Sequence, residues 1–277
     1  MACGPGLYKP TREKKLAAVN SYRNILKFLL PPEPAYQNGH LSHNDLHNEN
    51  IFVNPDHPTQ ITGIIDWQSV QIAPLFDQRL DASFLDYSGL EIGDDLARPK
   101  LTPDFDSLSK DQQSAALRLW QDHSLMVAWR RLVKKENPAQ YGAIMLGETT
   151  AGNLLSLAKR LYTIGEAHFT ALLLDLRDEW DSMPLVRSKR ASFPFHFTDA
   201  DVAKMKAEME KAERGIRIMQ YTKSEFGELW PEKGLVGHEQ YEEVKLELRA
   251  AKVKLIEHLK LSSSDAEEFE LYWPFDS

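Results

Sequence analysis

Four polar residues between positions 43 and 66 have the types and order that metal-assisted chemistry requires: His43, Asp45, Asn50 and Asp66. A carboxylate, a carboxamide and a second carboxylate are ligands that a hard divalent cation such as Mg²⁺ prefers. When few protein groups hold Mg²⁺, water and phosphate oxygens complete its coordination shell. These residue types therefore predict a Mg²⁺ site suited to phosphoryl transfer.

The spacing of these residues sharpens the prediction. Asp45 and Asn50 form an Asp-x-x-x-x-Asn pair, and His43 stands two residues before the aspartate. Kinase catalytic loops have this pattern. Asp66 ends an apolar stretch one short hairpin later, where the same arrangement needs its main metal-binding carboxylate. Each piece alone is common by chance, but together and in this order they favour a phosphotransferase.

The stretch from Leu41 to Gln78, which contains Ile64-Ile65-Asp66-Trp67, resembles the aminoglycoside phosphotransferase and choline kinase superfamily of small-molecule kinases. Within that superfamily it looks closest to the fungal "altered inheritance of mitochondria" phosphotransferase-like proteins. The specific likeness covers about 40 residues, and a looser one covers most of the chain. The resemblance implies an ATP- and Mg²⁺-dependent enzyme that phosphorylates a small-molecule hydroxyl whose identity the sequence does not name.

The resemblance also implies roles for individual residues. Asp45 would orient and deprotonate the acceptor hydroxyl, and Asn50 and Asp66 would hold Mg²⁺ against the phosphates of ATP. His43 would brace the loop rather than take part in the chemistry. Asp77 would stand near the acidic residue that follows the metal aspartate in such enzymes, although the usual glycine of that segment is absent.

Other residues of the stretch have structural interpretations. We predict that His47 is structural, that Glu49 is a solvated loop residue and that Trp67 is a core ring. A rival interpretation takes His43, Asp45 and His47 as ligands of Zn²⁺ in a hydrolase. That site would need further histidines at the ends of later strands, whereas His57 lies in a turn and His123, His168, His196 and His238 lie in or beside helical stretches.

The elements that must position these residues are short strands followed by many helices. Helical spacing of apolar residues predicts a helix over 11–30, which Pro31, Pro32 and Pro34 end. Short strands are predicted at 40–42, 51–53 and 61–65. Beyond about residue 108 the pattern is mostly helical, with helices predicted around 117–132, one or two over 154–174, and a hairpin of helices over 198–221 and 241–259. A coiled-coil partner surface in place of that hairpin would need longer repeats.

These elements predict an α+β fold, namely the C-terminal lobe of a protein-kinase-like fold over residues 1–277. Its catalytic-loop core spans about 11–90 and its helical extension about 108–277. The sequence contains no Gly-x-Gly-x-x-Gly and no strand lysine, and only 42 residues precede His43. We therefore expect the N-terminal nucleotide lobe to be absent or separate and the chain to be weakly active or inactive alone. The alternative is a non-catalytic, pseudokinase-like binding or scaffold domain.

Composition limits the other possibilities. A net charge of −8 argues against nucleic acid as the main partner. The basic clusters, among them Arg130-Arg131, are predicted to be solvated faces. Cys3 is the only cysteine, so no internal disulfide forms. No apolar run reaches the roughly 18 residues of a membrane span, and we expect a soluble intracellular protein. The mitochondrion is implied by the resemblance only, because the N-terminus is not a convincing transit peptide.

Overall fold

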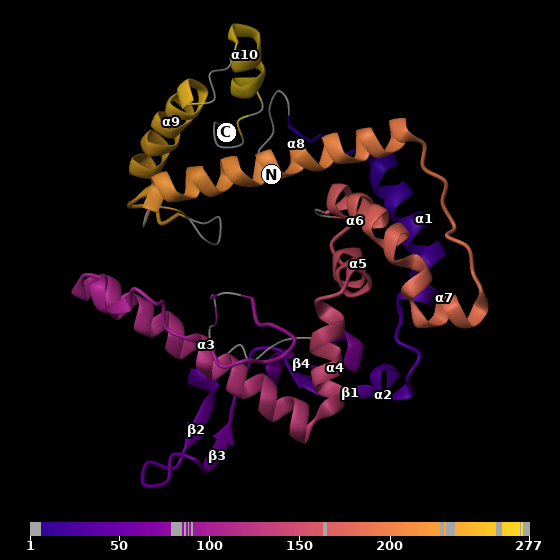
Figure 1. Ribbon diagram of the computed structural model, residues 1–277. Coiled ribbons are helices and arrows are strands. Elements are labelled where there is room, and N and C mark those ends of the chain that lie inside the picture. The colour runs from indigo at the N-terminus through magenta and orange to yellow at the C-terminus, as the bar shows by residue number, and fades with distance from the viewer. Residues whose placement is uncertain are drawn as a thin grey trace. The chain divides into compact units, whose positions relative to one another are not determined.

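The computed structural model describes residues 7–78, 85, 87, 89, 91–162, 165–227, 230, 236–258, 262–271 and 273. Most of these residues are helical and the strands are short (Figure 1), so the predicted α+β class is confirmed. The strands are β1 (Gly39–His43), β2 (Ile51–Val53), β3 (Ile61–Ile64) and β4 (Val70–Pro74). The helices are α1 (Arg12–Leu29), α2 (Pro34–Gln37), α3 (Lys110–Glu136), α4 (Pro138–Gly147), α5 (Thr150–Ala158), α6 (Glu166–Glu179), α7 (Pro184–Lys189), α8 (Asp199–Phe226), α9 (Tyr241–His258) and α10 (Ser263–Leu271).

The chain divides into two compact units. Unit 1 comprises Met1–Ile25, Leu157–Val186 and Arg190–Ser277, and unit 2 comprises Leu26–Ser156 and Arg187–Lys189. The strands and the predicted catalytic loop belong to unit 2, and the long helix α8 belongs to unit 1.

Two antiparallel ladders form the β structure of unit 2. β1 pairs with β4, from Gly39 opposite Pro74 to His43 opposite Val70. β2 pairs with β3 in a hairpin that begins with Ile51 opposite Ile64 and shifts register after Phe52. The three predicted strands are therefore present, and β4 is a fourth that the sequence prediction lacked.

Helices α3 and α4 pack against each other in unit 2, and α4 also contacts the short helical turn η3 (Leu75–Asp77) that follows β4. A capping box at Ser109 and Gln112 fixes the start of α3. One cluster of buried residues joins α3 to the segment before it and comprises Ile92, Leu96, Met126 and Val127. Arg130 is also buried on α3, where it pairs with Glu148 at 2.7 Å. The prediction that Arg130 lies on a solvated face was wrong, because this ion pair compensates its burial.

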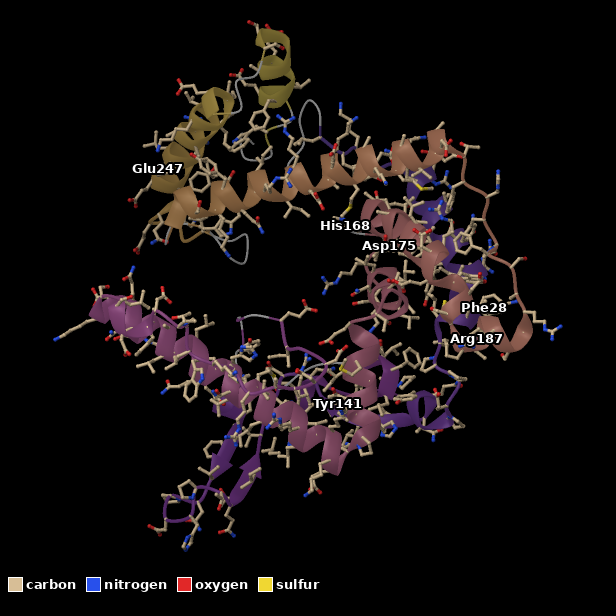
Figure 2. The ribbon with its side chains drawn as sticks, viewed as in Figure 1. Phe28, Tyr141, His168, Asp175, Arg187 and Glu247 are labelled. Atoms are coloured by element: carbon tan, nitrogen blue, oxygen red, sulfur yellow. The ribbon has the colours of Figure 1, made fainter. Side chains whose placement is uncertain are left out.

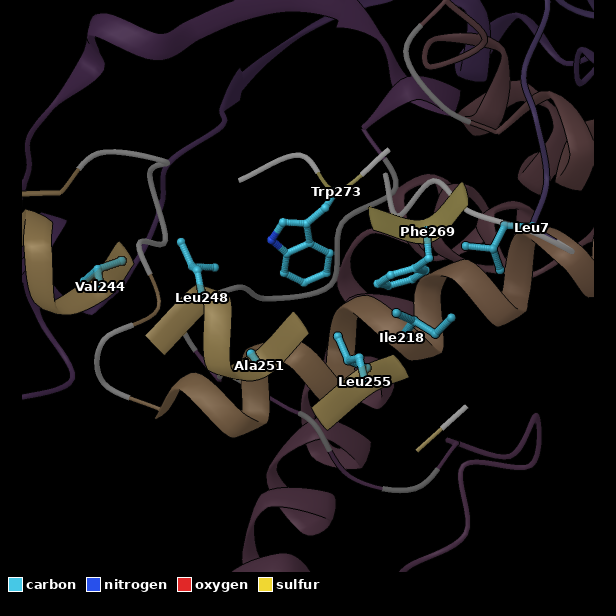
Figure 3. Packing of buried hydrophobic residues seen from close by; sticks show 8 residues of the cluster. All are labelled: Leu7, Ile218, Val244, Leu248, Ala251, Leu255, Phe269 and Trp273. Atoms are coloured by element: carbon cyan, nitrogen blue, oxygen red, sulfur yellow. The ribbon is translucent and has the colours of Figure 1, made fainter. Parts of the chain in front are cut away.

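Unit 1 contains a separate core built by the last helices. α8 and α9 pack together as the predicted helical hairpin, and α10 packs on α9. Their buried residues form one cluster with residues from both ends of the chain (Figure 3): Leu7, Ile218, Val244, Leu248, Ala251, Leu255, Phe269 and Trp273. The cluster residues that lie on α9 repeat at helical spacing, which is why the sequence predicts that helix. They are Val244, Leu248, Ala251 and Leu255.

The one or two helices predicted over 154–174 are two helices, α5 and α6. Gly165 separates them with a φ of 103°, a left-handed conformation that glycine adopts without steric cost. The side chains of α6 include His168 near its start and Asp175 farther along (Figure 2). Phe169 on the same helix is fully buried and packs edge-on against Tyr22 of α1.

Candidate active site

The two ladders of unit 2 bring the ends of three strands together around the predicted catalytic loop. His43 is the last residue of β1, and Asp45 follows it by two positions. Asn50 directly precedes β2, and Asp66 follows β3 by two positions. β4 then pairs with β1, so that Val70 lies opposite His43 at one end of that ladder. Ile51 lies opposite Ile64 at one end of the β2–β3 ladder. The loop of Asp45 and the turn of Asp66 therefore both lie next to these ladder ends.

Asn50 forms hydrogen bonds that link the parts of the predicted catalytic loop. Its side chain is buried, with 5% exposure, although its type is usually found at the surface. The amide Nδ2 donates to the Asp45 carbonyl oxygen at 2.8 Å and lies 3.1 Å from Nε2 of His47. The backbone oxygen of Asn50 accepts from the amide of Ile65 at 3.0 Å. Asn50 thus connects the loop of Asp45 to the residue before Asp66.

His43 provides the second connection. Its Nε2 lies 2.8 Å from the carbonyl oxygen of Ile65 and must donate to it, since a carbonyl only accepts. The ring packs edge-on against Trp67 with centroids 4.9 Å apart. In the neutral ring this tautomer leaves Nδ1 as an acceptor, and Nδ1 is buried with no hydrogen-bond partner among the described residues. The bracing position predicted for His43 agrees with these contacts.

Trp67 is not a core ring, so that prediction was wrong. Its side chain is 46% exposed, and its indole Nε1 donates to the Ile64 carbonyl oxygen at 2.7 Å. The Trp67 ring contacts His43 in an edge-to-face arrangement, and Trp67 begins the short helical turn that directly follows Asp66. Glu49 is exposed, as predicted.

Asp66 adopts a left-handed backbone conformation, with φ 64° and ψ 50°. Aspartate tolerates this region better than most residues, yet the conformation still costs free energy. Its Oδ1 is buried and has no hydrogen-bond partner in the part of the chain that the structure describes. A buried, unpaired carboxylate oxygen is costly unless a ligand or a cation satisfies it.

Asp45 is the accessible member of the group. Its side chain is 56% exposed, and its Oδ1 lies 3.9 Å from Nε2 of His47, which is too far for a hydrogen bond. An exposed carboxylate on a tethered loop can be reached by a substrate hydroxyl.

The rival zinc site is not assembled. Among the described residues, which include His43, Asp45 and His47, no group of three or more histidine, cysteine, aspartate or glutamate side chains could hold a metal. His43 Nε2 is engaged with a backbone oxygen, and His47 contacts the Asn50 amide, as its predicted structural role requires.

The residues present fit a hard cation better than a soft one. Asp66 presents a buried oxygen without a partner, and Asn50 is buried beside the same turn with its Nδ2 already engaged. The Asn50 amide therefore offers its oxygen, and not its nitrogen, to a cation. Oxygen donors of this kind suit Mg²⁺.

Two structural features of the site were not found from the sequence. The first is the backbone of Ile65, which accepts from His43 and donates to Asn50. The second is β4, whose pairing with β1 closes the region. Alternation of Val70 and Ile72 could have predicted that strand. Asp77 ends the short helical turn η3 (Leu75–Asp77) directly after β4.

None of the described helices is both long and apolar enough to cross a membrane.

Comparison with known proteins gives one match. The model of a phosphotransferase enzyme family matches residues 7–77, about a quarter of the chain, and this segment contains every predicted site residue. The match supports the resemblance to the aminoglycoside phosphotransferase superfamily over that segment. No curated protein and no solved structure matches the chain.

Proposed function

We propose that this protein is a phosphotransferase that uses ATP and Mg²⁺ to phosphorylate a small-molecule hydroxyl. The observation that carries the proposal is the buried, unpaired Oδ1 of Asp66, next to a loop that Asn50 and His43 tether. The match of residues 7–77 to a phosphotransferase family supports the same reaction class.

Each residue has a role in this proposal. Asp45 accepts the proton of the acceptor hydroxyl and orients the oxygen for attack. Asn50 and Asp66 would hold Mg²⁺, which supplies neutralising charge to the nucleotide phosphates when bound. His43 is a positioning residue that fixes the Ile65 carbonyl and, through it, the turn of Asp66.

The finer parts of the proposal rest on the sequence pattern. We propose that residues about 11–90 form the catalytic-loop core of a kinase-like C-terminal lobe and that the helices beyond about 108 extend it. The chain would then depend on nucleotide-holding groups that its own sequence does not contain. Likeness to the fungal mitochondrial-inheritance proteins, and a mitochondrial location, stay predictions from residues Leu41–Gln78 alone.

Metal binding by the full chain tests the proposal without requiring turnover. We expect Mn²⁺, observed by electron paramagnetic resonance, to bind weakly but saturably and to be displaced by Mg²⁺. Asp66→Asn should weaken Mn²⁺ binding by at least about tenfold, because asparagine keeps the left-handed turn but removes the charge. Asp56→Asn is the matched control, since Asp56 is an exposed carboxylate in the adjacent β2–β3 turn.

Two outcomes would redirect the assignment. Submicromolar Zn²⁺ binding that His47→Ala abolishes would support the hydrolase instead. Mn²⁺ binding that Asp66→Asn leaves unchanged would remove the metal site from this loop.

A second candidate, a non-catalytic binding domain, is favoured by an exposed apolar pair on the β1–β4 ladder. Leu41 and Ile72 are paired across the strands and are 62% and 75% exposed. Apolar side chains grouped in this way mark interaction sites in soluble proteins. A binding domain would retain its fold and its partner after Asp66→Asn, whereas the enzyme would lose its metal.

A further inference from the structure

Unit 1 contains a cavity of about 450 Å³, within the size range of small-molecule sites. Its wall is formed by the start of α6 and the middle of α8, together with Tyr8 and Trp230. His168, labelled on α6 in Figure 2, also lines it. All of its lining residues belong to unit 1, so the cavity is separate from the loop of Asp45 and from the function proposed for that loop.

A buried carboxylate lies in the wall of this cavity. Glu166 is 2% exposed, and its Oε2 pairs with Lys15 Nζ at 3.2 Å. Its other oxygen, Oε1, is buried and has no hydrogen-bond partner among the described residues. Because a carboxylate oxygen only accepts, the group that would satisfy Oε1 is a hydrogen-bond donor. Leaving it unsatisfied costs free energy that a ligand donor would recover.

The rest of the wall is mostly apolar. Ile216 and Met219 line the cavity from α8, and Trp230 lines it from the segment after that helix. Gly215 is a buried wall residue inside α8, where glycine is less favourable than alanine. A glycine at this position presents no side chain to the cavity.

Basic side chains complete the lining. Lys211 and Lys223 of α8 and Arg160 line the cavity, and all three are exposed. A second cation placed beside Glu166 would be repelled by Lys15, which already pairs with this carboxylate at 3.2 Å, so a neutral donor fits Oε1 better than an ammonium. We propose that this cavity binds a small amphipathic anion that carries a hydroxyl group: the hydroxyl donates to Glu166 Oε1, an apolar body lies on Ile216 and Met219, and the anionic group faces Lys211.

Three matched probes test each part of this ligand on the full chain by isothermal titration calorimetry. 8-Hydroxyoctanoate has all three features, octanoate lacks the hydroxyl, and 1,8-octanediol lacks the anion. We expect 8-hydroxyoctanoate to bind about tenfold more tightly than either of the others, because one lost charged or buried hydrogen bond is worth about that factor.

Three variants test where the probes bind. Lys211→Met should weaken both acids about tenfold and leave the diol unchanged, whereas Lys206→Met, an exposed lysine of α8 that does not line the cavity, should change none of them. Gly215→Leu should fill the cavity and abolish binding of all three, while thermal unfolding reports whether α8 remains folded. Absence of saturable binding in the millimolar range, equal affinity for all three probes, or binding that Gly215→Leu leaves intact would each overturn the proposal. None of these outcomes depends on metal binding at Asp66.

Discussion

His43 illustrates how a residue can control a candidate active site through a backbone group. Its Nε2 holds the Ile65 carbonyl, and the next residue carries the carboxylate proposed to bind metal. The left-handed turn at Asp66 is unfavourable by itself, so it needs contacts of this kind to persist. The family resemblance implied a bracing role for His43, and the structure shows that its ring contacts the Ile65 carbonyl oxygen.

We predict that His43→Ala lowers the free energy of unfolding by about 1–2 kcal/mol and weakens Mn²⁺ binding, although His43 is not a proposed ligand. His43→Gln, whose amide can donate to the same carbonyl, should restore much of the Mn²⁺ affinity. Denaturant unfolding and Mn²⁺ titration of the two variants measure these effects. Equal Mn²⁺ affinity in His43→Ala and the wild type would show that the Asp66 turn does not depend on this bond.

Tyr8 lies beside the buried carboxylate of Glu166. Burial is the main cause that raises the pKa of the Tyr8 hydroxyl, and the nearby charges of Glu166 and Glu208 raise it further. A phenol with a raised pKa in the folded protein binds its proton more tightly there than in the unfolded chain. Its contribution to stability is therefore complete below the usual value of 10.0 and is lost as pH rises toward the folded pKa.

We accordingly predict that the free energy of unfolding decreases as pH rises above 10 and that Tyr8→Phe makes this dependence shallower. Urea unfolding of both proteins at pH values on each side of 10 measures the effect. A wild-type curve that coincides in slope with that of Tyr8→Phe would mean that Tyr8 is not protected from ionisation.

At the scale of elements, local signals predicted most of the helices. α1, α3, α8 and α9 have apolar residues at helical spacing, and prolines or glycines mark several of their ends. α4 was not predicted because a single residue, Asn137, separates it from α3 and caps both helices. β4 was not predicted because its partner β1 lies about thirty residues earlier, and the alternation of Val70 and Ile72 is a short signal that does not reveal that pairing.

The capping box of α8 gives a test at this scale. The Thr198 hydroxyl accepts from the Asp201 amide at 3.2 Å, and the Asp201 carboxylate accepts from the Thr198 amide at 2.9 Å. We predict that Thr198→Ala destabilises unit 1 by about 0.5–2 kcal/mol, whereas Thr198→Ser, which keeps the hydroxyl, changes it by much less. Thermal unfolding followed by circular dichroism compares the two. A similar loss in both variants would assign the effect to the threonine methyl group rather than to the cap.

At the scale of the whole molecule, the candidate site could be predicted from the sequence more fully than the architecture around it. The spacing of His43, Asp45 and Asn50 within one loop is local information, so the pattern identified the loop directly. The two units depend on contacts between distant segments, such as Leu7 with the cluster of α8 and α9. Glu166 was missed for the same reason, since nothing in its local sequence indicates that Lys15 and Tyr8 bury it.

An assay of phosphate transfer tests whether this chain alone can carry out the proposed reaction. Phosphoryl transfer depends mostly on positioning and on stabilising charge at the transferred group. In the proposed function the loop of Asp45 positions an acceptor and a metal, but the sequence contains no Gly-x-Gly-x-x-Gly that would hold the nucleotide phosphates. We therefore predict that the 277-residue protein transfers phosphate from ATP to hydroxyl compounds at a rate near background, as measured with radiolabelled ATP.

Supplying the nucleotide-holding groups, by upstream extension or as a separate polypeptide, should restore transfer. In that system Asp45→Asn should lower turnover by about 10²–10⁴-fold, the usual contribution of a positioned acid–base group. Asp56→Asn should leave turnover unchanged, since it removes an exposed carboxylate from the nearby β2–β3 turn. Rapid Mg²⁺-dependent turnover by the 277-residue chain alone, insensitive to Asp45→Asn, would place the active site elsewhere in the molecule.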